Sequence, residues 1–286
     1  MALMAEQLKF FANFIEEKLG IIYAKDNYYQ LEKRLVDIAS QLCLSGPEEL
    51  WQKAQTGMHG QMRMLLLDLA TNNETSFFRD PALFKGIEER ILTELRFSGD
   101  SPQPLKIWCC ATSTGQEVYS MAILLNAWQR HNPRRKFSFL ATDYSQRVLK
   151  QAEEGRYSQL EVQRGLPATM MVRFFRNETN SEASESHSPT WVVSDDLKKN
   201  ISFKQQNLLE DFGNIGPFDL VLCRNVLIYQ NVENKRKIIA EIARRIAPDG
   251  YLIMGAAESL MGLSEDFDLM QLEKAVVYKK KSTPKT

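Results

Sequence analysis

The segment IWCCATSTGQEVYS, residues 107–120, combines a short apolar run, a turn of small residues and the start of an amphipathic helix. This order is typical of a strand that leads into a helix in an α/β protein. Ala111, Ser113 and Gly115 let a ligand approach the backbone closely. Ser113 and Thr114 are also good helix N-caps, so the turn alone does not separate a binding site from a helix cap.

Strand and helix patterns alternate from about residue 104 onward. Such alternation predicts a doubly wound, mostly parallel sheet with helices on both faces. Two closely spaced runs near the end, 267–271 and 275–279, predict a hairpin that adds an antiparallel edge. The predicted strands are 105–110, 137–141, 201–204, 218–223 and 251–255, and the predicted helices are 116–129, 145–154 and 232–246.

The first 70 residues show only helical periodicity. Apolar residues recur at spacings of three and four, and the predicted helices cover about 8–19, 28–44, 48–55 and 61–70. Gly20 is placed to end the first of them. We therefore expect a small all-helical amino-terminal domain, residues 1–72, followed by an α/β domain, residues 73–286.

One polar stretch interrupts the α/β pattern. RNETNSEASESHSPT, residues 176–190, is too poor in apolar residues to fold alone. We expect a small inserted β-ribbon with a mobile tip at about 170–200. The basic tail KKKSTPKT is expected to be solvated and disordered.

Composition argues against several classes of protein. With 36 Lys and Arg against 36 Asp and Glu, the chain lacks the basic excess that is usual for a nucleic-acid coat. No apolar run is long enough to span a membrane, and the start does not resemble a signal peptide. The four Cys form no CxxC pair with a nearby His, so we expect buried, reduced thiols in a cytoplasmic protein and no metal site.

Further candidate residues follow the other predicted strands. Asp143 ends the strand in FSFLATD, where a carboxylate could bind two ribose hydroxyls or help to cap the next helix. Arg224 and Asn225 follow FDLVLC, and Arg224 could serve a ligand or a structural ion pair. TNNETSFFRD, residues 71–80, offers polar donors beside two Phe. The single Gly115, with no GxGxxG, argues against a dinucleotide site.

Five segments resemble, in the same order, the motifs of the CheR-type chemotaxis receptor methyltransferases. They cover about residues 70–280, and five ordered matches are far more specific than one. The segments are TNNETSFFRD, ATSTGQEVYSMA, ATDYSQRVLKQAEEGRY, FDLVLCRNVLIY and GYLIMGAAESL.

The resemblance implies a class I S-adenosylmethionine-dependent methyltransferase fold. It also implies methyl transfer to glutamate side chains on the methylation helices of a chemoreceptor cytoplasmic domain, with S-adenosylhomocysteine as a product. Monomer is the default state of the family. The implied cofactor-binding residues are Asn73, Thr75, Arg79, Glu117, Asp143, Asn207, Leu208, Arg224 and Asn225, and Arg79 and Tyr229 are implied as catalytic. Glu117 would hold the methionine portion, Asp143 the ribose, and Asn207 and Leu208 the adenine.

This chemistry agrees with the residues present. A glutamate acceptor, with an ordinary pKa of about 4.3, is already ionised at neutral pH, so the absence of an evident His or Cys catalytic pair is no obstacle. The site must position the reactants instead. We expect Arg79 to hold the acceptor carboxylate and Tyr229 to orient acceptor or donor.

Two features depart from the family pattern. Residues 1–70 hold seven Lys or Arg against nine Asp or Glu, so the helical unit lacks a basic docking excess, although Lys33, Arg34 and Arg63 could form a local patch. Members that bind a receptor's carboxyl-terminal pentapeptide by strand addition carry a Gly-x-Gly turn in the insert. This insert has no Gly, and we expect no pentapeptide tether.

Two other functions remain open from the sequence alone. One is a cofactor-binding module of a signalling complex with little catalysis. The other is a methyltransferase for another substrate, although the Asn/Asp-Pro-Pro-aromatic motif frequent in amino-methylating enzymes is replaced here by CRNVLIY.

Overall fold

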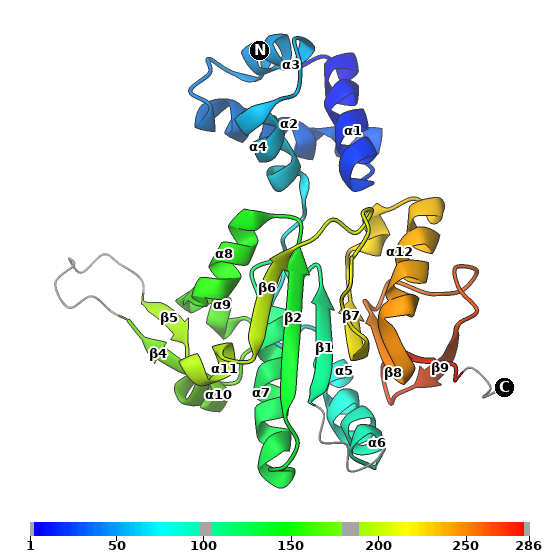
Figure 1. The fold of residues 1–286 in the computed structure, drawn as a ribbon. Coiled ribbons are helices and arrows are strands. Elements are labelled where there is room, and N and C mark those ends of the chain that lie inside the picture. The colour runs from blue at the N-terminus through cyan, green and yellow to red at the C-terminus, as the bar shows by residue number, and fades with distance from the viewer. Residues whose placement is uncertain (1–2, 98–103, 179–188, 283–286) are drawn as a thin grey trace.

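The computed structural model describes residues 3–97, 104–178 and 189–282. Its main feature is a seven-stranded sheet with the order β6-β2-β1-β7-β8-β10-β9 (Figure 1). The first five strands in this order are parallel, and the β10–β8 and β10–β9 pairs are antiparallel. Its strands are β1 (Leu105–Cys110), β2 (Phe137–Asp143), β6 (Ile201–Gln205), β7 (Phe218–Cys223), β8 (Ile246–Met254), β9 (Phe267–Gln271) and β10 (Val276–Lys280).

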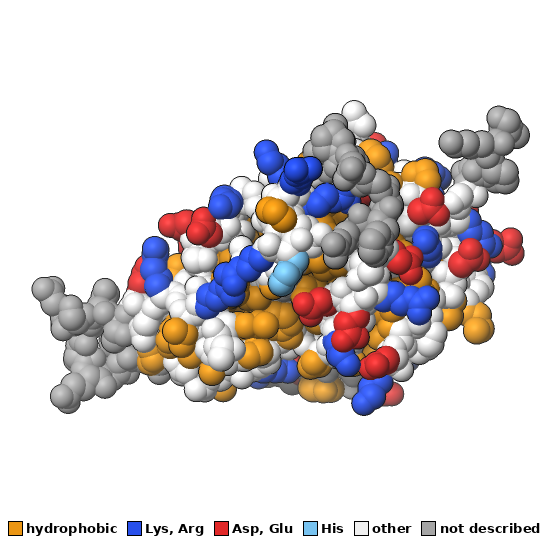
Figure 2. Space-filling view, turned by 90° about the horizontal axis from the view of Figure 1, so that it is seen from below, with side chains coloured by type: hydrophobic (Ala, Val, Ile, Leu, Met, Phe, Trp, Pro, Cys, Tyr) orange, Lys and Arg blue, Asp and Glu red, His pale blue; other side chains and the backbone are white. Residues whose placement is uncertain are grey.

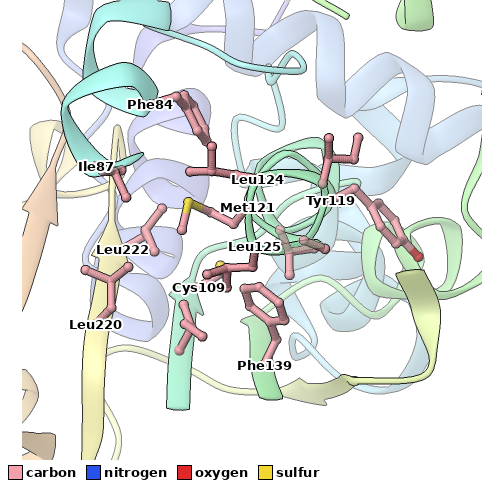
Figure 3. Close-up of a cluster of buried hydrophobic side chains, with 14 of the residues drawn as sticks. Phe84, Ile87, Cys109, Tyr119, Met121, Leu124, Leu125, Phe139, Leu220 and Leu222 are labelled. Carbon is pink, nitrogen blue, oxygen red and sulfur yellow. The ribbon is translucent and has the colours of Figure 1, made fainter. Parts of the chain in front are cut away.

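The two faces of the sheet pack against different helices. Alternating residues of β1 separate the faces: Ile107 and Cys109 belong to the cluster under α7, whereas Trp108 and Cys110 belong to the cluster under α12. Figure 3 shows the α7 side of this packing, where Met121 and Leu125 lie over Cys109. The helices of the α/β region are α5 (Pro81–Gly86), the π-helical turn η2 (Ile87–Ile91), α6 (Leu92–Phe97), α7 (Gln116–His131), α8 (Gln146–Glu154) and α12 (Val232–Arg245).

The amino-terminal helices lie above the carboxyl ends of the strands (Figure 1). They have their own core, in which Phe11, Ile15, Leu31, Leu35 and Ile38 are fully buried. The elements are α1 (Ala5–Leu19), the 3-10 turn η1 (Lys25–Asn27), α2 (Tyr28–Gln41), α3 (Pro47–Gln55) and α4 (Gly60–Ala70).

A second, three-stranded sheet has the order β3-β5-β4. It begins at residue 156, earlier than the sequence pattern indicates, because the strand directly after α8 joins it. The proposed mobile tip falls on residues 179–188, outside the described residues, as do the last four residues of the basic tail. This part of the chain holds β3 (Arg156–Ser158), α9 (Gln159–Gln163), α10 (Ala168–Phe174), β4 (Phe175–Asn177), β5 (Thr190–Val193) and α11 (Asp195–Lys198).

These elements confirm the predicted fold class: a doubly wound, mostly parallel sheet with flanking helices and a helical amino-terminal region. The expectation of four buried thiols was wrong for Cys43, which is exposed. Cys43 follows the end of α2 in a left-handed turn with φ 55°, and this turn carries it out of the helical core. The division after residue 72 stays a prediction.

The described surface agrees with a neutral chain. On the face opposite the amino-terminal helices, side chains of both charges occur with apolar side chains between them (Figure 2). In the described part of the chain, no helix combines the length and the apolar content needed to cross a membrane.

Helix α1 is fixed against the α/β region at its carboxyl end. Gly20 ends α1 with φ 70°, and a Cβ there would lie 2.0 Å from Gln230 Oε1 and 2.6 Å from Asn234 Nδ2. The Gln230 amide donates to the Leu19 carbonyl at 2.9 Å, and Asn234 Nδ2 donates to Gln230 Oε1. A side chain at position 20 would therefore break contacts that join the two parts of the molecule.

We expect Gly20→Ala to lower the free energy of unfolding by about 1 kcal/mol through left-handed backbone strain, and further through displacement of Gln230. Urea denaturation measures the loss. Gly60→Ala is the matched control, because Gly60 has φ 53° but no atom within 4 Å of its Cβ position. Equal losses in the two variants would contradict the close packing of α1 on Gln230.

Candidate active site

A pocket opens at the carboxyl edge of the sheet, where β1 lies between β2 and β7. From β1, the strand order runs to β2 and β6 on one side and to β7 and β8 on the other. The α/β folds bind ligands at such a reversal of strand order. The space amounts to about 1000 Å³, the open mouth included. Five segments line most of it: 71–79, 111–117, 143–144, 206–208 and 224–230.

All ten residues expected from the sequence to form the site line this one pocket. These residues are up to 156 positions apart in the chain, from Asn73 to Tyr229, yet all of them line the same pocket. They are Asn73, Thr75, Arg79, Glu117, Asp143, Asn207, Leu208, Arg224, Asn225 and Tyr229. No His or Cys is among the described residues that line the pocket, so acid–base catalysis by His or attack by Cys is not built into it.

The turn between β1 and α7 forms the floor of the pocket. Ala111 and Ser113 have φ values of 54° and 51°, and Gly115 has φ 94°. Left-handed backbone is costly for residues other than Gly and persists where surrounding contacts enforce it. The Ser113 hydroxyl donates to the Asn73 carbonyl at 2.8 Å, so the turn also holds the 71–79 segment over the pocket.

Asp143 fixes the same turn from the end of β2. Its carboxylate accepts from the backbone N–H of Ser113 at 2.9 Å and of Ser145 at 3.0 Å. Burial raises the pKa of Asp143 above its ordinary value, and the two backbone donors partly offset this effect. Ser145 is the cap of α8, because its hydroxyl accepts from Val148 N–H. Each carboxylate oxygen of Asp143 retains a lone pair for a ligand hydroxyl.

Arg224, buried at the end of β7, forms an ion cluster with the largely buried Glu117 and the exposed Asp80. Its side chain is 1% exposed and donates to Glu117 at 2.7 Å, to the Asp80 carboxylate, and to the Arg79 carbonyl at 3.2 Å. The structure therefore shows Arg224 in a structural ion pair, and its contact with a cofactor stays a prediction. With both carboxylates ionised, the three side chains carry a net charge of −1, which leaves the cluster able to accept a cation.

Glu117 faces the pocket from the first turn of α7, and Arg224 lines the same pocket beside it. Burial raises the pKa of Glu117 above the ordinary 4.5, and the adjacent Arg224 guanidinium counteracts part of that rise. One carboxylate oxygen accepts from Arg224, which leaves the other for a ligand donor. A ligand ammonium would suit this position, since it would stabilise the ionised carboxylate.

Tyr229 is held at the mouth of the pocket from two sides. Its hydroxyl accepts from Asn72 Nδ2 at 2.6 Å, and its carbonyl accepts from Ile22 N–H at 3.0 Å. Because the Asn72 amide is the donor, the hydroxyl proton of Tyr229 is free to point elsewhere. Arg79 lies in the same segment as Asn72, and its guanidinium donates to the Glu74 carbonyl at 3.3 Å.

The amino-terminal helix contributes to the pocket in a way that the sequence did not indicate. Asn207 Nδ2 donates to the Lys18 carbonyl at 2.9 Å, so this side chain joins the pocket wall to the end of α1. Leu19 and Ile21 then line the pocket themselves. Sequence reasoning also missed Asp80, whose only signal was its position directly after Arg79 in the TNNETSFFRD segment.

Comparison with known proteins gives a consistent family match. The model of the CheR methyltransferase, SAM binding domain, matches residues 73–276.

Several relatives match nearly the whole chain, among them the following three. A chemotaxis protein methyltransferase of Vibrio anguillarum is 32% identical over 278 residues, 96% of this chain and 97% of that protein. Chemotaxis protein methyltransferase 1 of Vibrio cholerae has the same identity and coverage. Chemotaxis protein methyltransferase 1 of Pseudomonas aeruginosa is 33% identical over 275 residues, 95% of this chain and 96% of that protein.

Proposed function

The chain belongs to the CheR methyltransferase family, and we propose that it methylates glutamate side chains in the cytoplasmic domain of a chemotaxis receptor. It is a methyltransferase and its cofactor is S-adenosylmethionine. The observation that carries the proposal is the convergence of all ten motif residues on one pocket at the carboxyl edge of the sheet. The products would be a glutamate methyl ester and S-adenosylhomocysteine.

The donor groups of the pocket fit the cofactor. The Arg224–Glu117–Asp80 cluster carries a net charge of −1 and suits the ammonium of the methionine portion, with Glu117 as its partner. Asp143 suits the ribose hydroxyls, and Leu208 with the backbone of Asn207 suits the adenine. When bound, S-adenosylmethionine supplies an electrophilic methyl group on a sulfonium.

The remaining cofactor residues come from both walls of the pocket. Asn73 and Thr75 face it from the 71–79 segment, and Asn225 faces it from the end of β7. The Asn207 amide is already committed to the Lys18 carbonyl, so we assign this side chain to closing the pocket and only its backbone to the adenine.

The acceptor side needs orientation and no general base. A glutamate carboxylate is ionised at neutral pH, so it can attack the methyl group directly. We assign Arg79 to bind that carboxylate, and we assign the Tyr229 hydroxyl to donate a hydrogen bond to it. Asn72 supports this role, because its amide fixes the Tyr229 oxygen while leaving the proton available.

The receptor would meet the protein at the mouth of this pocket, beside the amino-terminal helices. Arg34 is used internally, since its guanidinium donates to the Ala70 carbonyl at 2.6 Å and to the Tyr23 hydroxyl. Lys33 and Arg63 are the exposed cations of the suggested patch. A partner in the cytoplasmic domain of a receptor implies that the protein acts in the cytoplasm. We also propose that it acts as a monomer, which light scattering checks through the mass in solution.

Incubation with methyl-labelled cofactor and receptor cytoplasmic domains tests the function. We expect base-labile label on receptor glutamates, because an ester is formed. Label on another residue type, or none on any receptor domain, would contradict the proposed acceptor.

The same assay tests the two assigned residues. Arg79→Lys and Tyr229→Phe should each lower kcat about tenfold or more, since each loses a hydrogen bond to a charged acceptor. Binding of S-adenosylhomocysteine should change much less. Arg90→Lys, an exposed position that pairs with Glu94, is the matched control. Full activity of both site variants would remove Arg79 and Tyr229 from the catalytic assignment.

Cofactor affinity should depend on pH through Glu117. Its raised pKa means that lowering the pH neutralises it earlier than an ordinary glutamate, and a neutral side chain attracts an ammonium less. Calorimetry should therefore show weaker binding of S-adenosylhomocysteine at about pH 5 than at about pH 7.5. Glu117→Gln should bind more weakly at neutral pH and lose less affinity on acidification. An affinity of the wild type that stays constant or rises at low pH would refute this role.

We propose that no pentapeptide tether is present, because residues 176–190 contain no Gly for the turn that such an insert requires. Calorimetry with a receptor's carboxyl-terminal pentapeptide should give no measurable heat of binding at micromolar concentrations. Saturable micromolar binding would show that this insert can bind the peptide with a different turn.

A further inference from the structure

Glu258 is a carboxylate that receives an unusual number of backbone donors. It follows β8 in the GAAES segment and accepts from five N–H groups in two loops. One oxygen accepts from Asn225 and Gly255, both at 2.8 Å. The other accepts from Val226 at 3.0 Å, Leu227 at 2.8 Å and Ile228 at 3.3 Å.

The donors belong to the loop that carries two site residues. Val226, Leu227 and Ile228 are at the start of the 3-10 turn η3 (Leu227–Tyr229), where N–H groups have no partner within the turn. Asn225 precedes them with a left-handed φ of 57°. The Glu258 carboxylate satisfies these N–H groups together, and it thereby fixes the backbone between Asn225 and Tyr229.

Gly255 makes room for this arrangement. A Cβ at position 255 would lie 2.7 Å from Asn225 Nδ2 and 2.8 Å from Glu258 Oε2. The Glu258 oxygen accepts from the loop, and the Asn225 amide belongs to the loop that it holds. In the GAAES segment, the absence of a side chain at Gly255 therefore leaves room for the Glu258 carboxylate.

Glu258 is not among the residues that line the cofactor pocket, whereas Asn225, Val226 and Tyr229 are. Glu258 contacts the pocket-lining loop through its backbone, and its charge also contributes to the raised pKa of Glu117. Tyr229 needs such support, because η3 is a single short turn on a partly exposed loop, and a displacement of about 1 Å in a reacting geometry can cost a factor of about 100 in rate.

We propose that Glu258 is a positioning residue for methyl transfer, which sets the place of Tyr229 and Asn225 through the loop between them. This inference rests on the proposed function. It assigns a role to the GAAES segment, whose match to the family motif says nothing about what its residues do.

The test uses the full chain with Glu258→Gln. The amide keeps one acceptor oxygen but turns an NH₂ group toward backbone donors, so the loop should loosen. We expect kcat to fall about ten- to a hundredfold, and KM for the receptor domain and Kd for S-adenosylhomocysteine to change by smaller factors. Hydrogen exchange at the amides of 225–228 should become faster. Glu265→Gln, an exposed position on the same loop region, is the control and should behave as wild type.

A second variant covers the case in which Glu258→Gln fails to fold. Gly255→Ala keeps the carboxylate but pushes against it and against Asn225, so it should also lower kcat more than it raises KM. In addition, Tyr229→Phe combined with either variant should lose less than the product of the single losses, because both changes act on one side chain.

Wild-type kcat in Glu258→Gln, or losses that multiply fully with Tyr229→Phe, would overturn the positioning role. Faster exchange together with lowered kcat and nearly constant KM supports it. If the wild type labels no receptor glutamate at all, the proposed function fails, and this result is distinct from a failure confined to the variants.

Discussion

The ion cluster that the buried Arg224 forms with Glu117 and Asp80 is the interaction on which the site depends. It joins the end of β7, the start of α7 and the segment after the amino-terminal helices, three parts of the chain that share no secondary structure. Removing charges from water is costly, and a buried guanidinium is tolerated only when its partners are close. The segment that carries Asn73, Thr75 and Arg79 is thereby held over the sheet edge, and the cluster retains a negative charge for a cationic ligand.

Other polar side chains also join separate segments around the pocket. Asp143 holds the β1–α7 turn in its left-handed conformation, and Asn207 and Gln230 hold the end of α1 at the rim. The strained residues Ala111, Ser113 and Asn225 all lie where two loops meet. Asp143, Asn207 and Gln230 thus each have a structural partner before any ligand binds.

Much of this architecture could be predicted from the sequence. The runs 105–110 and 218–223 match β1 and β7 at both ends, since a buried parallel strand is a continuous apolar run with polar residues after it. The ten expected site residues came from the resemblance to the family's motifs; the structure brings them to one pocket, and their roles stay predictions. The helices 81–97, the early start of the small sheet and the exposure of Cys43 were not found, because they depend on packing between distant segments.

The partnerships within the site were equally invisible in the sequence. Nothing near Asp80 or Glu258 in the chain shows that one binds a guanidinium 144 positions away and the other binds five N–H groups. Motifs identify which residues matter, whereas contacts decide what each does. Asn207 and Asn73 both line the pocket, but only the contacts show that the Asn207 amide binds the end of α1.

The central claim is that Glu117 and Asp143 receive the ammonium and the ribose of the cofactor in this pocket. A crystal structure of the complex with S-adenosylhomocysteine tests it most directly. We expect the ligand ammonium within hydrogen-bond distance of the Glu117 carboxylate and the ribose hydroxyls at Asp143, with Arg224 still paired to Asp80. A ligand bound elsewhere, or one whose ammonium and ribose contact neither carboxylate, would contradict it.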